Sequence, residues 1–265
     1  MKLTSIASAL LLALPLTALA DDPPAPKQGL SGSGEAGLAV ASGNTKSENI
    51  NVKVDLKFTD DRWKDDFYVL AVRNKSDVTN TTSGAIDYQT TANRWEGGAS
   101  LGYKLDDRSY IVGAMRYEHD QFSPYNYQYI ASLGYGFQVL KNATDELSFE
   151  IGPGYKVVQP TSIYIANPTP PPDFIKIKPD SDTSLAGRGK VDYKHSFNSN
   201  TSLTDSFLVE SASGNTFIQN DLGLAVKMTN SLALKATYEV RRNSQVADGF
   251  KNTDQLLTTN LVYSF

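Results

Sequence analysis

The chain has 265 residues, with 25 Lys and Arg against 29 Asp and Glu, a formal net charge of −4 and no cysteine. The lack of cysteine predicts no lipoprotein anchor, no disulfide scaffold and no cysteine-based metal or nucleophile chemistry. The small charge imbalance gives no sign of a nucleic-acid partner.

The first 20 residues have the pattern of a secretory signal peptide. Lys2 gives a cationic start, a short apolar run follows, and Ala18 and Ala20 form a small-residue cleavage site, so we expect cleavage after Ala20. After residue 20 no apolar stretch approaches the ~20 residues of a membrane helix. Any membrane must therefore be crossed by strands. Residues 21–30 contain three prolines and are predicted to be an extended periplasmic linker.

Period-two alternation of apolar and polar residues predicts a strand in twelve segments. The clearest segment is 49–58, in which Ile50, Val52 and Val54 alternate with Asn51 and Lys53. In chain order the segments are 35–41, 49–58, 67–74, 92–104, 110–119, 127–140, 147–157, 184–197, 202–210, 216–228, 232–241 and 253–265.

The connections between these strands alternate in length. Every second one is short, namely 59–62, 105–108, 141–146, 198–201 and 229–231. Of the others, four are longer (75–91, 120–126, 159–183 and 242–252), and 42–47 and 211–215 resemble turns. Short periplasmic turns opposite longer loops, with an even strand count, are typical of a bacterial outer-membrane barrel and not of a soluble sandwich. We therefore predict an all-β fold, a 12-stranded antiparallel transmembrane β-barrel of the outer membrane over residues 31–265.

The last strand predicts how the barrel is delivered and closed. Leu261, Tyr263 and Phe265 lie on its apolar face, and this ending resembles the C-terminal signal that brings outer-membrane barrels to their insertion machinery. That machinery, outer-membrane lipid and lipopolysaccharide are the expected partners. We expect this strand to pair with the first strand around 34–41. Outward aromatic residues near the short turns should form an interfacial belt: Phe58, Tyr103, Phe137, Phe149, Phe197 and Phe265.

The glycine-rich start and the closing strand also carry a family resemblance. Gly34-Glu-Ala-Gly37 runs into Ser42-Gly-Asn-Thr45, the Trp95 strand follows, and the chain closes with Leu261-Val-Tyr-Ser-Phe265. With these features, residues 31–265 resemble the YdiY-type salt-induced outer membrane protein family, a domain of unknown function. The resemblance implies location and fold and brings no catalytic motif. The proline-bearing loop 159–183 is expected to be peculiar to this member.

The sequence shows no recognisable set of catalytic residues. The chain has two histidines, the usual general bases. His119, beside Asp120, belongs at the long-loop end of its strand, and His195 belongs near a short turn on an outward face. They cannot share a site, and no histidine pair has metal-ligand spacing. We interpret His119 and Asp120 as a solvated pair at the barrel mouth, and we expect no enzymatic activity, no cofactor and no metal site.

Strand alternation assigns a set of charged side chains to the lumen. The inward cations are Lys53, Lys57, Arg73, Arg94, Arg116, Lys156, Arg188, Lys190, Lys194, Lys227, Lys235 and Arg241. The inward anions are Glu35, Asp55, Glu96, Glu118, Glu150, Asp192, Glu210, Asp221 and Glu239, which leaves a cationic surplus of three. The ten that we select as lumen-lining site candidates are Lys53, Arg94, Arg116, Glu118, Glu150, Arg188, Lys190, Lys194, Lys235 and Glu239.

Two interpretations of this lumen stay open. In one, the charges pair and fill the barrel, which is then a closed structural barrel that presents extracellular loops. In the other, they line a narrow passive channel for small solutes or ions, and Arg188, Lys190 and Lys194 bias it toward anions. The loop 159–183 is either a stiff exposed segment or a lid over the mouth. The channel is the favoured function, and its link to salt stress rests on the family name alone.

Overall fold

The computed structural model describes residues 28–42, 46–80, 83–123, 125–167, 173–246 and 251–265. The expected signal peptide and all but the last three residues of the expected linker lie outside this part of the chain. In the described residues, no helix is long and apolar enough to cross a membrane.

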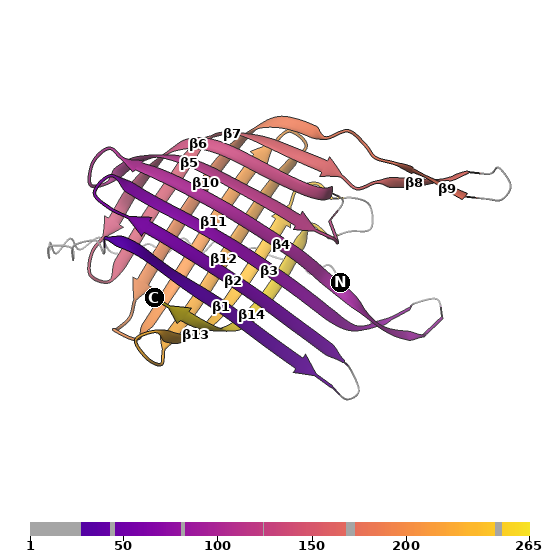
Figure 1. Cartoon of the computed structure of the whole chain (residues 1–265), viewed down its shortest axis with the longest axis horizontal. Helices are drawn as coiled ribbons and strands as arrows, with labels where there is room; N and C mark the ends of the chain where they lie inside the picture. Colours follow the sequence, from indigo (N-terminus) through magenta and orange to yellow (C-terminus); the bar gives the residue numbers. More distant parts are fainter. Residues whose placement is uncertain (1–27, 43–45, 81–82, 124, 168–172, 247–250) are drawn as a thin grey trace, which may run out of the picture.

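Twelve antiparallel strands form one closed barrel (Figure 1), and the predicted fold class is confirmed. Neighbours in the barrel are also neighbours in the chain, except where β7 pairs with β10 and where β1 pairs with β14. The barrel strands are β1 (Gly29–Ala41), β2 (Ser47–Thr59), β3 (Trp63–Thr79), β4 (Ile86–Lys104), β5 (Ser109–Asp120), β6 (Tyr125–Lys141), β7 (Asp145–Pro160), β10 (Asp182–Ser196), β11 (Thr201–Ala212), β12 (Asn215–Lys227), β13 (Leu232–Asn243) and β14 (Thr253–Ser264).

The alternation of β2 shows why these sequences form a membrane barrel. Val52 and Val54 face outward and are exposed, whereas Asn51, Lys53 and Asp55 on the opposite face are buried or half-buried inside the barrel. A soluble sheet would place the apolar face inside. Here the exposed apolar faces of all twelve strands form one band, which is the surface that a barrel presents to lipid.

Outward aromatic pairs mark both edges of this band. Near the short turns, Trp63 and Tyr103 lie with ring centroids 5.3 Å apart. Toward the other end, Trp95 and Tyr117 stack at 4.8 Å. Trp95 and Tyr103 are eight residues apart on β4, about 26 Å along the strand at ~3.3 Å per residue. With a strand tilt of ~40° this corresponds to a height of about 20 Å, so the two pairs lie inside the limits of the ~25 Å apolar band of outer-membrane barrels.

The five short turns lie at one end of the barrel, called the turn end, and all have one design. In each turn, the side-chain oxygen of one residue accepts backbone N–H bonds from the residues two and three positions later. This residue lies one or two positions after the preceding strand, and the five are Asp60, Asp106, Asn142, Asn198 and Thr229. This side-chain contact stabilises a tight turn. In Asp60 and Asp106 the same N–H donors hold the carboxyl pKa below its ordinary value.

The connections at the opposite end, called the loop end, are shorter than the sequence predicted. Most of the expected loop 75–91 is strand, because β3 continues to Thr79 and β4 begins at Ile86. The two strands stay paired past a bulge at Asn74 and Lys75, where their register shifts. The difference in length between the two sets of connections is therefore smaller than predicted, although 244–252 and the segment between β7 and β10 remain long.

The segment between β7 and β10 forms a separate hairpin of β8 (Ile163–Asn167) and β9 (Asp173–Ile177). Gln159 fixes its base, since its amide donates to the Pro179 carbonyl at 2.9 Å and its Oε1 accepts from Ser181. The hairpin continues away from the barrel rather than over its mouth (Figure 1). In this structure the hairpin therefore does not cover the mouth as a lid, and within the described residues β8 and β9 pair with each other and with no barrel strand.

The barrel closes along a short seam between β1 and β14. Ser33–Ala36 pairs with Leu261–Ser264, and Gly32 and Phe265 exchange backbone hydrogen bonds of 3.1 and 3.0 Å. The predicted pairing is confirmed over its first part only. β1 also starts at Gly29, two residues before the predicted start of the barrel.

Candidate functional site: the charged lumen

The centre of the barrel is filled by buried charged side chains. Arg116 on β5 makes a bidentate pair with Glu210 on β11, in which its Nε lies 2.9 Å from Oε1 and its Nη2 contacts Oε2. Its Nη1 lies 2.6 Å from Glu118 and 3.5 Å from Glu96. These groups are almost fully shielded from solvent.

A second arginine extends this cluster across the whole lumen. Nη2 of Arg241 on β13 lies 2.5 Å from Glu118 Oε2 on β5, and these strands are six positions apart in either direction around the barrel. The Phe217 ring lies between Arg116 and Arg241, with its centroid 4.7 and 5.0 Å from the two Cζ atoms. Such cation–π contacts add to the attraction when the groups are desolvated.

A further ion pair, between β4 and β13, crosses the lumen beside Arg116 and Arg241. Nη2 of Arg94 on β4 donates to both oxygens of Glu239 on β13, at 2.8 and 3.0 Å. We call the three arginines and their carboxylate partners the charge layer: Arg94, Glu96, Arg116, Glu118, Glu210, Glu239 and Arg241. Its members come from four strands, so their positions depend on closure of the barrel.

The charge layer separates two cavities. The loop-side cavity has a volume of about 890 Å³ and the turn-side cavity about 500 Å³. Four residues line both, namely Val72, Arg94, Glu239 and Leu256. The two cavities therefore approach each other at the Arg94–Glu239 pair, beside Val72 and Leu256.

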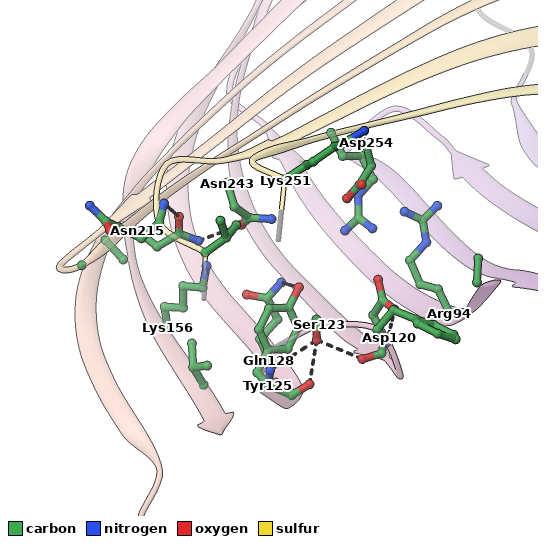
Figure 2. Close-up of a pocket in the computed structure, with 18 of the residues that line it drawn as sticks. Arg94, Asp120, Ser123, Tyr125, Gln128, Lys156, Asn215, Asn243, Lys251 and Asp254 are labelled. Carbon is green, nitrogen blue, oxygen red and sulfur yellow. Dashed lines mark hydrogen bonds between the residues drawn. The ribbon is translucent and has the colours of Figure 1, made fainter. Parts of the chain in front are cut away.

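The close-up of the loop-side cavity shows its polar wall (Figure 2). Lys156 and Arg94 lie on opposite sides of the view, with Tyr125 and Gln128 between them. Gln128 donates to the Tyr125 hydroxyl at 2.8 Å, and that hydroxyl donates to Glu118 Oε1 at 2.8 Å. This chain connects the cavity wall to the charge layer.

On the turn side, most lumen charges are paired with a near neighbour. Lys53 contacts Asp55 at 3.0 Å, and Lys235 contacts Glu35 at 2.7 Å. The structure places all ten site candidates along the lumen, and each of the ten has an ion-pair partner. Phe217, Tyr125 and Gln128 were missed. Phe217 shares the inward phase of Gln219 and Asp221 on β12, which is the signal that could have identified it.

The Arg188, Lys190 and Lys194 series does not form a free cationic ladder. Each of the three is paired, with Glu150 at 2.9 Å, Asp192 at 2.7 Å and Glu146 at 3.1 Å in turn. The predicted anion bias from these residues therefore finds no support in the geometry.

The predicted cationic surplus of the lumen was also wrong. Arg73 lies on the outward face of β3, because it is exposed and paired with outward Ile50 on β2. Lys64 and Lys251 add two cations to the cavity walls, but seven further carboxylates line the cavities: Asp65, Asp66, Asp120, Glu146, Asp182, Asp205 and Asp254. The strand containing Arg73 has weak contrast between its faces, which is why its phase was misassigned.

The two histidines lie at opposite ends of the barrel, as expected, but His119 and Asp120 do not form a pair. His119 is on the outward face beside Trp95, at 6.1 Å between ring centroids, whereas Asp120 lines the loop-side cavity. His195 contacts Asp145 at 2.7 Å near the turn end. Among the residues with described positions, no group of three His, Cys, Asp or Glu could hold a metal ion.

Fold and lumen together define a porin-like outer-membrane β-barrel, with an apolar outer surface and a charged interior. The chain belongs to the family described as "Protein of unknown function, DUF481", whose model matches residues 34–265.

Three proteins illustrate the comparison with known sequences and structures. The chain is 24% identical over 245 residues to "Uncharacterized protein YdiY" of Escherichia coli K12, covering 92% of this chain and 86% of that one. The "Translocator domain of autotransporter NalP from Neisseria meningitidis" has the same fold, with a TM-score of 0.50, 13% identity and coverage of 91% and 90%. The COG4313 outer membrane channel from Pseudomonas putida F1 matches at 0.44, with 9% identity and coverage of 94% and 99%.

Proposed function

We propose that this protein is a narrow passive channel of the outer membrane for small solutes or ions, and that the Arg94–Glu239 pair is its constriction. The observation that carries the proposal is that two cavities, one toward each end of the lumen, share Arg94 and Glu239 as lining residues. A twelve-stranded barrel lies between the eight-stranded barrels that side chains fill and the wide sixteen-stranded porins. An interior of intermediate width supports a restricted path.

The constriction should open rarely. In this pair one guanidinium nitrogen, Arg94 Nη2, makes charge-assisted hydrogen bonds to both oxygens of Glu239. Removing one partner from a buried ion pair costs about 3–5 kcal/mol. Passage then depends on movement of Arg94 or Glu239 against this cost. We expect small, infrequent conductance steps rather than the steady current of a wide pore.

Planar-bilayer recording of the refolded, signal-less protein tests this proposal. The wild type should give discrete steps. The double variant R94Q/E239Q removes both charges together and should raise the open fraction at least several-fold. A matched control is K57Q/D66N, which removes a more exposed pair at 3.4 Å on the turn side and should change little.

The alternative function is a closed structural barrel that presents its loops. The complete burial of Glu118, Glu210 and Phe217 at the centre of the lumen favours it. Silence in both the wild type and R94Q/E239Q would support this alternative and exclude the channel.

The proposal includes location and partners. Export follows cleavage of the signal peptide after Ala20, insertion uses the barrel-insertion machinery, and the outward band contacts outer-membrane lipid and lipopolysaccharide. Mass spectrometry of the protein isolated from outer membranes tests the cleavage site, with Asp21 expected as the first residue. The link to salt stress rests on the family resemblance.

We also propose that the protein is not an enzyme. The separation of His119 from Asp120 on opposite faces of β5 supports this. Hydrolysis of lipid or peptide that is lost in His119→Ala would contradict it.

A further inference from the structure

The loop-side cavity is lined by three residues that carry buried nitrogen atoms without a hydrogen-bond partner in the described part of the chain. The atoms are Nζ of Lys156, Nε of Arg94 and Nε of Arg241. Lys156 is the most buried of the three residues, with 2% of its surface exposed. Buried polar groups are normally hydrogen-bonded, so three unsatisfied donors around one cavity require an explanation.

Lys156 differs from the two arginines in its charge balance. Arg94 and Arg241 are neutralised by Glu239 and Glu118. In contrast, no carboxylate oxygen of the described residues lies within 4.0 Å of Lys156 Nζ. Four other lumen lysines have such a partner, namely Lys53, Lys190, Lys194 and Lys235. Lys64 on the turn side lacks one but contacts the Tyr110 hydroxyl at 3.5 Å.

A buried ammonium with no contacting carboxylate is unfavourable, because it has lost its hydration. Lys156 gains in return only the attraction of Glu210 and Glu118, neither of which contacts it. An anion in the adjacent cavity removes this penalty. The volume of about 890 Å³ is suitable for a small organic molecule. The cavity wall also offers amide and hydroxyl groups, among them Gln128, Asn243 and Ser184, that can bind hydroxyl groups.

We propose that the loop-side cavity is a binding site for a small hydroxylated organic carboxylate, whose carboxylate contacts Lys156 Nζ. Arg94 lies on the opposite side of the cavity from Lys156 (Figure 2), so its Nε can donate to a hydroxyl at the far end of the same ligand. This arrangement favours an extended hydroxy acid over a compact inorganic phosphate. The inference uses the lumen of the proposed channel but not transport through it, and the site would exist in a closed barrel too.

Saturation-transfer NMR titration of the refolded full-length mature protein in detergent micelles tests this site. Gluconate and sorbitol form a matched pair of probes, because they share a hydroxylated six-carbon chain and differ at the carboxylate. Gluconate should bind at least ten-fold more tightly than sorbitol, and inorganic phosphate should compete poorly. Equal binding of gluconate and sorbitol, or tighter binding of phosphate, would overturn the assignment.

Three variants test whether the ammonium group of Lys156 is the group that binds the ligand carboxylate. Lys156→Met should weaken gluconate binding at least ten-fold and raise the urea midpoint of unfolding, since it removes the unpaired ammonium and keeps the side-chain volume. Lys156→Arg should retain binding. Lys64→Met is the control on the turn side, where Lys64 already contacts the Tyr110 hydroxyl at 3.5 Å, and it should leave gluconate affinity unchanged.

The stability of the Lys156→Met variant distinguishes a ligand-binding role of Lys156 from a purely structural one. A lower urea midpoint together with unchanged gluconate affinity would show that Lys156 is satisfied within the barrel, and would contradict the proposal. Neither result depends on conductance, so the failure of the binding site and the failure of the channel can be distinguished.

Discussion

At the residue scale, one polar side chain near the start of each short turn stabilises the turn by accepting two backbone N–H bonds. Asp60 Oδ1 accepts N–H bonds of 2.7 and 2.6 Å, and Asp106 Oδ1 accepts bonds of 2.8 and 2.7 Å. Asn142 and Asn198 accept the same bonds in their turns without a charge. Thr229 does the same through its hydroxyl oxygen, so two of the five turns use a titrating side chain and three use a non-titrating one.

This difference predicts an acid-sensitive contribution to stability. The pKa of Asp60 and Asp106 is lower in the folded barrel than the ordinary value of 3.8. Their stabilisation is therefore complete above the unfolded-state pKa and is lost as the pH falls through the folded-state pKa. Urea unfolding in liposomes should show a smaller loss of stability between pH 6 and pH 3 for D60N/D106N than for the wild type.

The asparagine turns provide the matched control for this experiment. N142D/N198D introduces the titrating form at two of the other three turns and should make the barrel more acid-sensitive. If both double variants follow the wild-type pH curve, the turn carboxylates do not contribute and the acid response arises in the lumen.

At the element scale, the short seam between β1 and β14 makes closure of the barrel dependent on Phe265, which directly follows β14. Phe265 exchanges two backbone hydrogen bonds with Gly32, each of which contributes about 1 kcal/mol. Its ring also covers Gly32, where an added Cβ would lie 2.5 Å from Phe265 Cζ. Deletion of Phe265 should sharply lower the fraction of folded barrel in outer membranes, measured by heat-modifiable gel mobility.

A second aromatic residue at the turn end tests whether the effect of Phe265 on assembly depends on its position in the seam. Phe197 is exposed on the outward face but lies after β10, far from the seam. Phe197→Ala should assemble nearly as well as the wild type. Equal damage from both changes would assign the effect to the aromatic belt rather than to closure of the barrel.

The sequence predicted most of the strands. It did not predict which inward side chains form ion pairs across the lumen. The alternation of β2 identifies its faces without ambiguity, because Asn51 and Lys53 contrast with Val52 and Val54. Arg73 was misassigned because polar residues occur on both faces of β3 near its bulge. The Arg241–Glu118 contact joins positions 123 residues apart, and only the closed barrel, with its tilt and stagger, decides which inward residues meet.

At the scale of the whole molecule, two separate parts could control access to the lumen. One is the charge layer at its centre. The other is the hairpin of β8 and β9, which the sequence suggested as a lid. The structure directs the hairpin away from the barrel, and its base is fixed by Gln159 rather than by any residue of the charge layer (Figure 1). Control of passage should therefore belong to the charge layer alone.

Deletion of residues 163–177 decides between these parts. The variant keeps Gln159 and Pro179, so the barrel strands should retain their pairing and the protein should fold. Its conductance steps and gluconate affinity should equal those of the wild type, whereas R94Q/E239Q changes the steps without removing the hairpin. A higher conductance after the deletion would mean that the hairpin folds over the mouth in the membrane and that β8 and β9 act as a lid.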